Sequence, residues 1–125
     1  MRGSKFHNRI AEEVKTIFCN HNWRVYTEFR YRKNGVTTYL DLLAVKGNKC
    51  VGCEIETTVR HVIDNTQKAQ SAGIMLWIIA PSRKLCRQVK QKLSYSNIAT
   101  NHPSIRILLL GQLESELKYL SEKTV

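Results

Sequence analysis

The sequence predicts an α/β fold, in which a mixed sheet is flanked by helices, in a single domain spanning residues 1–125. The first 60 residues show one segment with helical spacing followed by three strand-like segments separated by tight turns. After them, helical segments alternate with continuous apolar runs. An antiparallel meander followed by βαβ units requires a sheet that contains both parallel and antiparallel strands. A length of 125 residues with 42% hydrophobic residues suits one globular domain.

The first two elements are predicted from the spacing of apolar residues. From Phe6 to Phe18 they recur at helical intervals, which predicts an amphipathic helix ending near Asn20 to Asn22. Residues 23–31 then alternate, which predicts a strand with one solvent-exposed face. The less exposed face is expected to carry Val25, Thr27, Phe29 and Tyr31.

Two turns define the meander. Asn34 and Gly35 accept the positive φ values of a tight hairpin, so residues 36–45 are expected to pair with the preceding strand. Lys46 to Asn48 forms the second turn, and residues 49–57 form a third strand.

The second half predicts alternating helices and buried strands. Residues 60–72 are predicted to form a helix closed by Gly73, and the apolar run 74–80 is typical of a strand buried on both faces. Ser82 caps a basic helix that extends to about residue 94. A strand at residues 105–110 and a helix at 112–122 complete the order αβββαβαβα.

The charge favours a polyanionic partner. Twenty Lys and Arg against ten Asp and Glu give a net charge of +10. Nucleic acid is the commonest intracellular polyanion, whereas a membrane surface or an acidic protein is a weaker alternative. No run of 18 apolar residues is present and the N-terminus lacks an apolar core. We therefore expect DNA as the partner, no membrane span and a cytoplasmic location.

Four cysteines raise the alternative of structural zinc. Cys50 and Cys53 are spaced as half of a zinc site, which Cys19 and His21 would complete. However, residues three apart on a strand point to opposite faces. A core position for Cys53 is therefore the preferred interpretation.

Three acidic residues indicate where chemistry would occur. Glu54 and Glu56 are expected on one face of the third strand, and Asp41 interrupts the apolar second strand. The second turn places Asp41 nearly opposite Glu54. Carboxylates so placed destabilise a sheet unless a cation or an ion pair compensates them. A bound divalent cation is one explanation, and surface ion pairs with Arg60, Lys49 or Arg30 are the other.

The segments 39–45 and 53–57, read together, resemble the core of the PD-(D/E)xK nuclease superfamily, which has the restriction-endonuclease-like fold and an αβββαβ order. The likeness covers residues 6–80, and the later elements form an added βα extension. Within the superfamily, the chain is similar to small archaeal-type Holliday junction resolvases and to nucleases of viruses and mobile elements. It implies that Asp41 and Glu54 hold Mg²⁺ or Mn²⁺, with the carbonyl of Ile55 as a further ligand.

The chain departs from this family at informative positions. Tyr39 and Leu40 stand in place of the proline in the family's name, and Glu56 stands where lysine is usual. Some members with Glu-x-Glu are active, and others carry the lysine on the following helix, where Lys68 is a candidate. A solvated Lys68 is the alternative.

The first helix offers one more acidic candidate. Junction resolvases carry a glutamate there that approaches the metal. The helical projection selects Glu13 for this role, although a salt bridge at the rim would explain it equally well. Glu28 is expected to balance neighbouring arginines.

Together these observations predict a Mg²⁺-dependent deoxyribonuclease. Glu56 or Lys68 would orient or deprotonate the attacking water. The cations expected to contact the DNA backbone are Arg30, Arg32, Lys33, Arg60 and His61. Cleavage is expected to be structure-selective or weakly sequence-specific, by a homodimer. The alternative is a catalytically inactive DNA-binding module or a subunit of a nuclease or transposition complex.

Overall fold

The structure of the chain, a computed structural model, describes residues 4–98 and 104–123. The predicted single domain also includes residues 1–3, 99–103 and 124–125, which lie outside the described part. The observed elements are α1 (Lys5–Asn20), β1 (Arg24–Lys33), β2 (Val36–Lys46), β3 (Lys49–Ile55), α2 (Val62–Ala72), β4 (Met75–Ala80), α3 (Arg83–Tyr95), β5 (Ile105–Leu109), the 3₁₀ turn η1 (Leu110–Gln112) and α4 (Leu113–Lys123). The predicted order is confirmed, with η1 as an addition.

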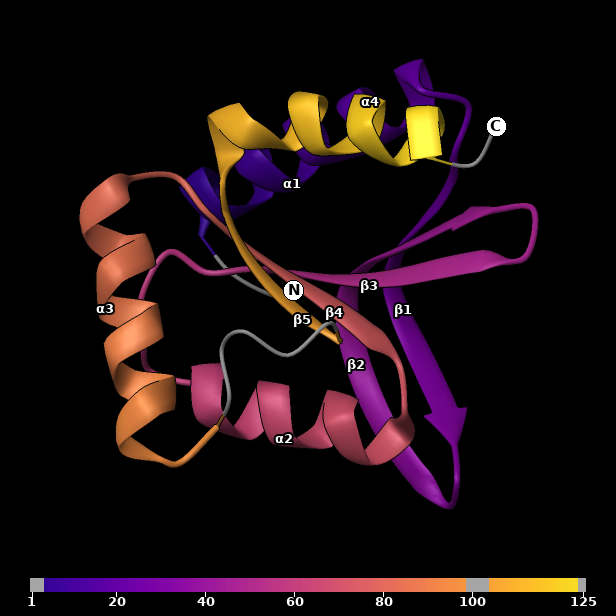
Figure 1. Cartoon of the computed structure of the whole chain (residues 1–125). Coiled ribbons are helices and arrows are strands. Elements are labelled where there is room, and N and C mark those ends of the chain that lie inside the picture. The colour runs from indigo at the N-terminus through magenta and orange to yellow at the C-terminus, as the bar shows by residue number, and fades with distance from the viewer. Residues whose placement is uncertain (1–3, 99–103, 124–125) are drawn as a thin grey trace.

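One mixed sheet lies at the centre, with strands in the order β1-β2-β3-β4-β5. The first three strands are antiparallel, and β3, β4 and β5 run parallel. Helices α1 and α4 cover one face, and α2 and α3 cover the other (Figure 1). The predicted mixed sheet flanked by helices is therefore confirmed.

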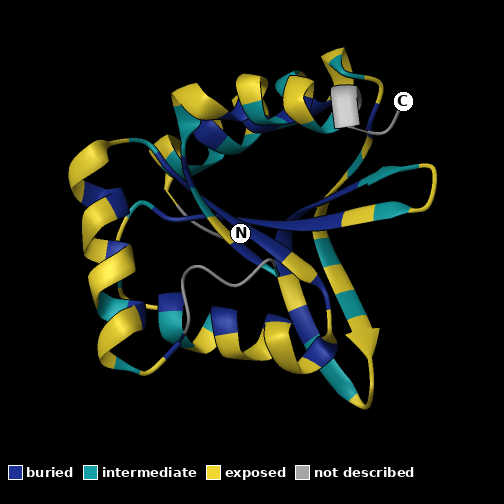
Figure 2. Cartoon of the chain, in the orientation of Figure 1, coloured by how far each residue is buried: buried dark blue, intermediate teal, exposed yellow. Residues whose placement is uncertain are grey.

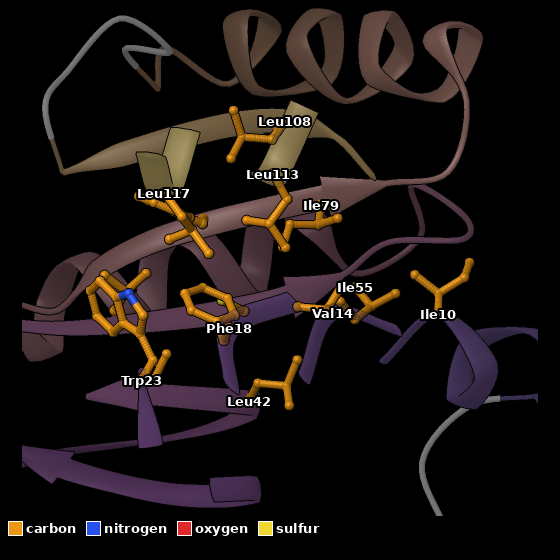
Figure 3. Close-up of a cluster of buried hydrophobic side chains, with 14 residues drawn as sticks. Ile10, Val14, Phe18, Trp23, Leu42, Ile55, Ile79, Leu108, Leu113 and Leu117 are labelled. Carbon is orange, nitrogen blue, oxygen red and sulfur yellow. The ribbon is translucent and has the colours of Figure 1, made fainter. Parts of the chain in front are cut away.

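Apolar residues fill the space on both sides of this sheet. On the α1/α4 side, Phe18 packs edge-on against Trp23 at 5.4 Å and lies 6.0 Å from Trp77, measured between ring centroids. Figure 3 shows this cluster. Strand β4 is buried along almost its whole length, as expected for a strand covered on both faces, whereas the outer faces of the helices are exposed (Figure 2).

The β1–β2 hairpin changes face in its middle. Val25 packs on the α1/α4 side, whereas Phe29 packs on the α2/α3 side. Leu42 and Leu40 are divided in the same way. The expectation that Val25, Phe29 and Tyr31 share a face is therefore wrong, because strict alternation holds only for uninterrupted strand conformation. The interruption is at Glu28, whose φ is +48°.

Glu28 stands opposite Asp41 in the register, between the paired residues Thr27 with Leu42 and Phe29 with Leu40. Left-handed conformation costs a non-glycine residue on the order of 1–2 kcal/mol, and such strain is often found at functional sites. The irregularity that redirects both strands thus lies beside the acidic residue singled out in the sequence.

Substitutions at Glu28 test this strain. We expect Glu28→Val to lower the free energy of unfolding by about 1 kcal/mol or more, because β-branched residues tolerate positive φ least. Glu28→Gly should change stability little, since relief of strain is offset by the greater chain entropy of glycine in the unfolded state. Urea denaturation of the parent, Glu28→Val and Glu28→Gly measures the free energy of unfolding of each. Equal stability of the Val and Gly variants would contradict the observed conformation.

Two further observations concern the predicted elements. Strand β3 ends at Ile55, two residues earlier than predicted, so Glu56 follows the strand. Its main-chain N–H still donates to the carbonyl of Ile79 at 2.9 Å, which keeps Glu56 beside β4.

Among the helices in the described part of the chain, none is long and apolar enough to cross a membrane.

Candidate functional site

A cavity of about 280 Å³ opens where β2 and β3 stop pairing, and we call it the Asp41 cavity. It brings together the three acidic residues predicted from the sequence, with side chains from α1, α2 and the loop before α2. Its lining consists of His7, Asp41, Glu54, Ile55, Glu56, Thr57, Thr58, His61 and Asn65.

The hairpin register explains why Asp41 and Glu54 meet there. The last pair between β2 and β3 is Leu42 with Cys53, so the next residues along the two strands are Asp41 and Glu54. Beyond that pair, the main-chain N–H of Ile55 donates to Oδ2 of Asp41 at 2.8 Å. A side-chain oxygen thus takes the role of a main-chain acceptor at the point where the strands separate.

All three carboxylates are buried despite their charge. The exposed fractions are 5% for Asp41, 2% for Glu54 and 6% for Glu56. These values are far below those of surface ion pairs, so the alternative in which Glu54 and Glu56 lie on an exposed face does not describe this site. Holding carboxylates out of water is expensive unless cations or hydrogen-bond donors compensate them.

The neighbouring thiol responds to this environment. Burial raises the pKa of Cys53 well above its ordinary value, and the negative charges of Glu54 and Asp41 raise the pKa further. Cys53 belongs to the apolar cluster under α1, which confirms its predicted core position, whereas Cys50 is exposed. The Cys53 thiol therefore stays protonated at neutral pH.

His7 is a member of the site that the sequence reasoning missed. Its Nε2 lies 3.2 Å from Oδ2 of Asp41, and its side chain is 12% exposed. Because a carboxylate oxygen only accepts, this hydrogen bond requires the proton on Nε2. A signal was present in the sequence: His7 precedes Val14 by seven residues and so falls on the buried stripe of α1.

The acidic residue that α1 brings near Asp41 is Glu12 rather than Glu13. A second hollow, of about 350 Å³, shares His7 and Asp41 with the Asp41 cavity and is also lined by Glu12 and Glu28; we call it the Glu28 hollow. Glu13 is exposed and lines neither space. The projection selected Glu13 because it counted Phe6 as a core residue, whereas Phe6 is 48% exposed and the buried stripe follows Ile10, Val14 and Phe18.

Lys68 does not join the cavity. Its Nζ pairs with Oδ2 of Asp64 at 3.0 Å, one turn earlier on α2, and its side chain is 51% exposed. The residues of α2 that line the cavity are His61 and Asn65. No lysine or arginine is among the lining residues, so the structure offers Lys68 no direct part at this site.

The predicted DNA-contacting cations fall in two separate places. Arg60 is exposed and directly precedes His61, which lines the cavity. The hairpin that carries Arg30, Arg32 and Lys33 has its tip at Asn34, beside Gly73 at the other end of α2. An 11-residue helix is roughly 16 Å long, so the two groups would contact different phosphates.

Helix α3 adds cations that were not among the predicted contacts. It carries five basic residues and no acidic one. Nζ of Lys92 donates to the carbonyl of Val59 at 2.9 Å and so ties α3 to the loop that carries Thr57 and Thr58. The other four, Arg83, Lys84, Arg87 and Lys90, are exposed.

The donor set has the chemistry of a site for a hard divalent cation. Within residues 4–98 and 104–123, no group of three or more His, Cys, Asp or Glu is arranged to hold a metal ion. Mg²⁺ needs fewer, because it keeps several waters and uses one or two carboxylates together with substrate phosphate. Asp41, Glu54 and the carbonyl of Ile55 fit that requirement by chemical type.

Comparisons with known proteins add only the fold. No protein-family model matches the chain, and no curated sequence matches it. A solved structure titled "Crystal Structure of Protein of Unknown Function AF1548" is similar, with a TM-score of 0.51 and 10% identity. The likeness covers 91% of this chain and 66% of that protein, just under two thirds. At this identity it shows a shared fold and carries no function.

Proposed function

We propose that this chain is a Mg²⁺-dependent DNA endonuclease of the restriction-endonuclease-like fold. The observation that carries the proposal is the burial of Asp41, Glu54 and Glu56 around one cavity of a protein with a net charge of +10. A protein that attracts polyanions yet buries carboxylates at one point has a site suited to a cation shared between protein and phosphate.

Each residue of the cavity has a part in this proposal. Asp41, Glu54 and the Ile55 carbonyl would hold the metal, and Mg²⁺ would polarise the scissile phosphate and acidify a water. His7 and the Ile55 N–H hold Oδ2 of Asp41 in place. Glu56, within the same cavity, is the group suited to orient or deprotonate the attacking water.

Cleavage assays with the purified chain test the proposal. Labelled linear duplex, nicked duplex, splayed-arm DNA and a four-way junction are incubated with Mg²⁺, with Mn²⁺ and with EDTA. We expect cutting with either metal and none with EDTA, with a preference among shapes rather than sequences. If no DNA is cut under any condition, the nuclease proposal fails.

Binding should be dominated by backbone charge. We expect the DNA affinity to fall steeply as salt rises, with a log-log slope of about −0.9 per phosphate contact on duplex DNA, because each contact releases condensed counterions. Titrations between about 50 and 200 mM salt in EDTA measure this slope without cleavage. Binding that is absent, or insensitive to salt, would remove the nucleic-acid interpretation.

A catalytically inactive DNA-binding module on the same fold is the second candidate. One observation favours it: neither lysine nor arginine lines the Asp41 cavity, and Glu56 occupies the position where the resembled family usually has lysine. A chain that binds DNA with the expected salt slope but cuts no substrate would support this candidate.

A homodimer is part of the nuclease proposal, since cutting both strands requires two sites.

A further inference from the structure

Three hollows adjoin one another through shared lining residues. The Asp41 cavity is in the middle and shares His7 and Asp41 with the Glu28 hollow. Through Thr57 it also adjoins a third hollow of about 400 Å³, lined by Phe6, Thr57, Ser82, Lys84 and Gln88 among others, which we call the Phe6 hollow. A strand bound at the middle cavity therefore has two directions in which to continue.

The charges of the outer hollows differ. Glu12, Glu28 and Asp41 line the Glu28 hollow, which has no lysine or arginine in its lining. The Phe6 hollow contains Lys84 and no acidic residue. Phosphate groups are repelled by carboxylates and attracted by an exposed ammonium, so a nucleic-acid strand is directed toward the Phe6 hollow.

The aromatic ring in this hollow indicates the form of the strand. Phe6 is 48% exposed, although it is a large apolar residue next to the candidate active site. The bases of a duplex are stacked within it, so an exposed ring can meet the face of a base only when that base is unstacked. Aromatic rings beside cations are the usual means by which proteins hold single strands.

We propose that the Phe6 hollow is a binding subsite for a single-stranded segment next to the scissile phosphate, with Phe6 stacking on a base and Lys84 contacting the backbone. The inference rests on the proposed DNA endonuclease function and narrows its substrate to DNA that is unpaired on one side of the cut. Flaps, splayed arms and branch points have this feature, whereas blunt duplex does not.

Binding without metal tests the stacking part. Affinities for splayed-arm DNA and for blunt duplex of matched length are measured in EDTA for the parent, Phe6→Ala and Phe6→Trp. We expect Phe6→Ala to weaken splayed-arm binding about tenfold, since a stacked base contributes on the order of 1–3 kcal/mol, and to leave duplex binding unchanged. Phe6→Trp should retain the preference. Tyr95→Ala, which removes a ring 87% exposed outside this hollow, is the matched control and should change neither affinity.

The salt dependence tests the backbone contact. Lys84→Gln should reduce the magnitude of the slope of log affinity against log salt concentration on splayed-arm DNA. The expected reduction is about 0.7, the value for one phosphate contact on a single strand. Lys118→Gln, which removes an exposed charge on α4, should leave the slope unchanged. Thermal unfolding of every variant checks that the fold is retained.

The outcomes separate this inference from the proposed function. If the parent cuts DNA with Mg²⁺ but Phe6→Ala and Lys84→Gln bind splayed arms as the parent does, the subsite is wrong and the nuclease stands. Equal losses on splayed-arm and blunt DNA also overturn the subsite. If the parent cuts nothing, yet both variants selectively weaken splayed-arm binding, the subsite stands and the nuclease fails.

Discussion

Asp41→Asn and Glu54→Gln should each lower Mg²⁺-dependent cleavage by roughly a thousandfold or more, because metal stabilisation of the transition state contributes several kcal/mol and each 1.36 kcal/mol is a factor of ten. DNA binding in EDTA should stay equal or become tighter, since a negative charge near phosphate is removed. Single-turnover cleavage rates and binding titrations on the same preparations measure the two effects separately.

The amide substitution matters at Asp41. Asp41→Ala would leave the buried N–H of Ile55 without its acceptor, at a cost of about 1–3 kcal/mol, whereas asparagine keeps an oxygen there. If Asp41→Asn loses cleavage activity while its free energy of unfolding is unchanged, the loss is due to the metal site and not to a weakened fold. For Glu54→Gln the free energy of unfolding should hold or rise, because one of three crowded carboxylates becomes neutral. Variants that cut as fast as the parent would refute the metal site.

Much of the fold could be predicted because local signals coincide with tertiary structure. Asn34 and Gly35 both have positive φ at the first hairpin, and Gly73 closes α2 in left-handed conformation, as their residue types indicated. The face switch of β1 could not be predicted, since nothing in a glutamate marks it for positive φ. Packing of Phe29 against the α2 layer and of Val25 against the α1 layer imposes it.

The site was predictable to the extent that it follows from strand register. Asp41 and Glu54 meet because a two-stranded register is set by its turn, which the sequence marks clearly. Site residues on helices were harder to predict than site residues on strands. A helical projection shows which residues share a side of the helix, but not at which residue the buried part of the helix begins. This explains the choice of Glu13 and the omission of His7. For Lys68, the structure agrees with the alternative of a solvated lysine.

Within the proposed nuclease, Glu56 is better placed than Lys68 to act on the attacking water, because Glu56 lines the Asp41 cavity and Lys68 does not. Glu56→Gln should lower the maximal cleavage rate by about 10²- to 10⁴-fold, the range for loss of a general acid or base. Lys68→Gln should remain within a few-fold of the parent, because Lys68 is exposed and paired with Asp64. Rates are measured at saturating DNA over a series of Mg²⁺ concentrations.

The metal dependence distinguishes water handling from metal binding at Glu56. A group that acts on the water lowers the maximal rate and leaves the Mg²⁺ concentration for half-maximal activity unchanged, whereas a lost ligand raises that concentration. Asp64→Asn is the matched control for Lys68→Gln, since it breaks the same surface pair without removing the lysine. If Lys68→Gln loses activity while Asp64→Asn and Glu56→Gln do not, α2 must move Lys68 into the cavity when DNA binds, and Glu56 is not the group that activates the water.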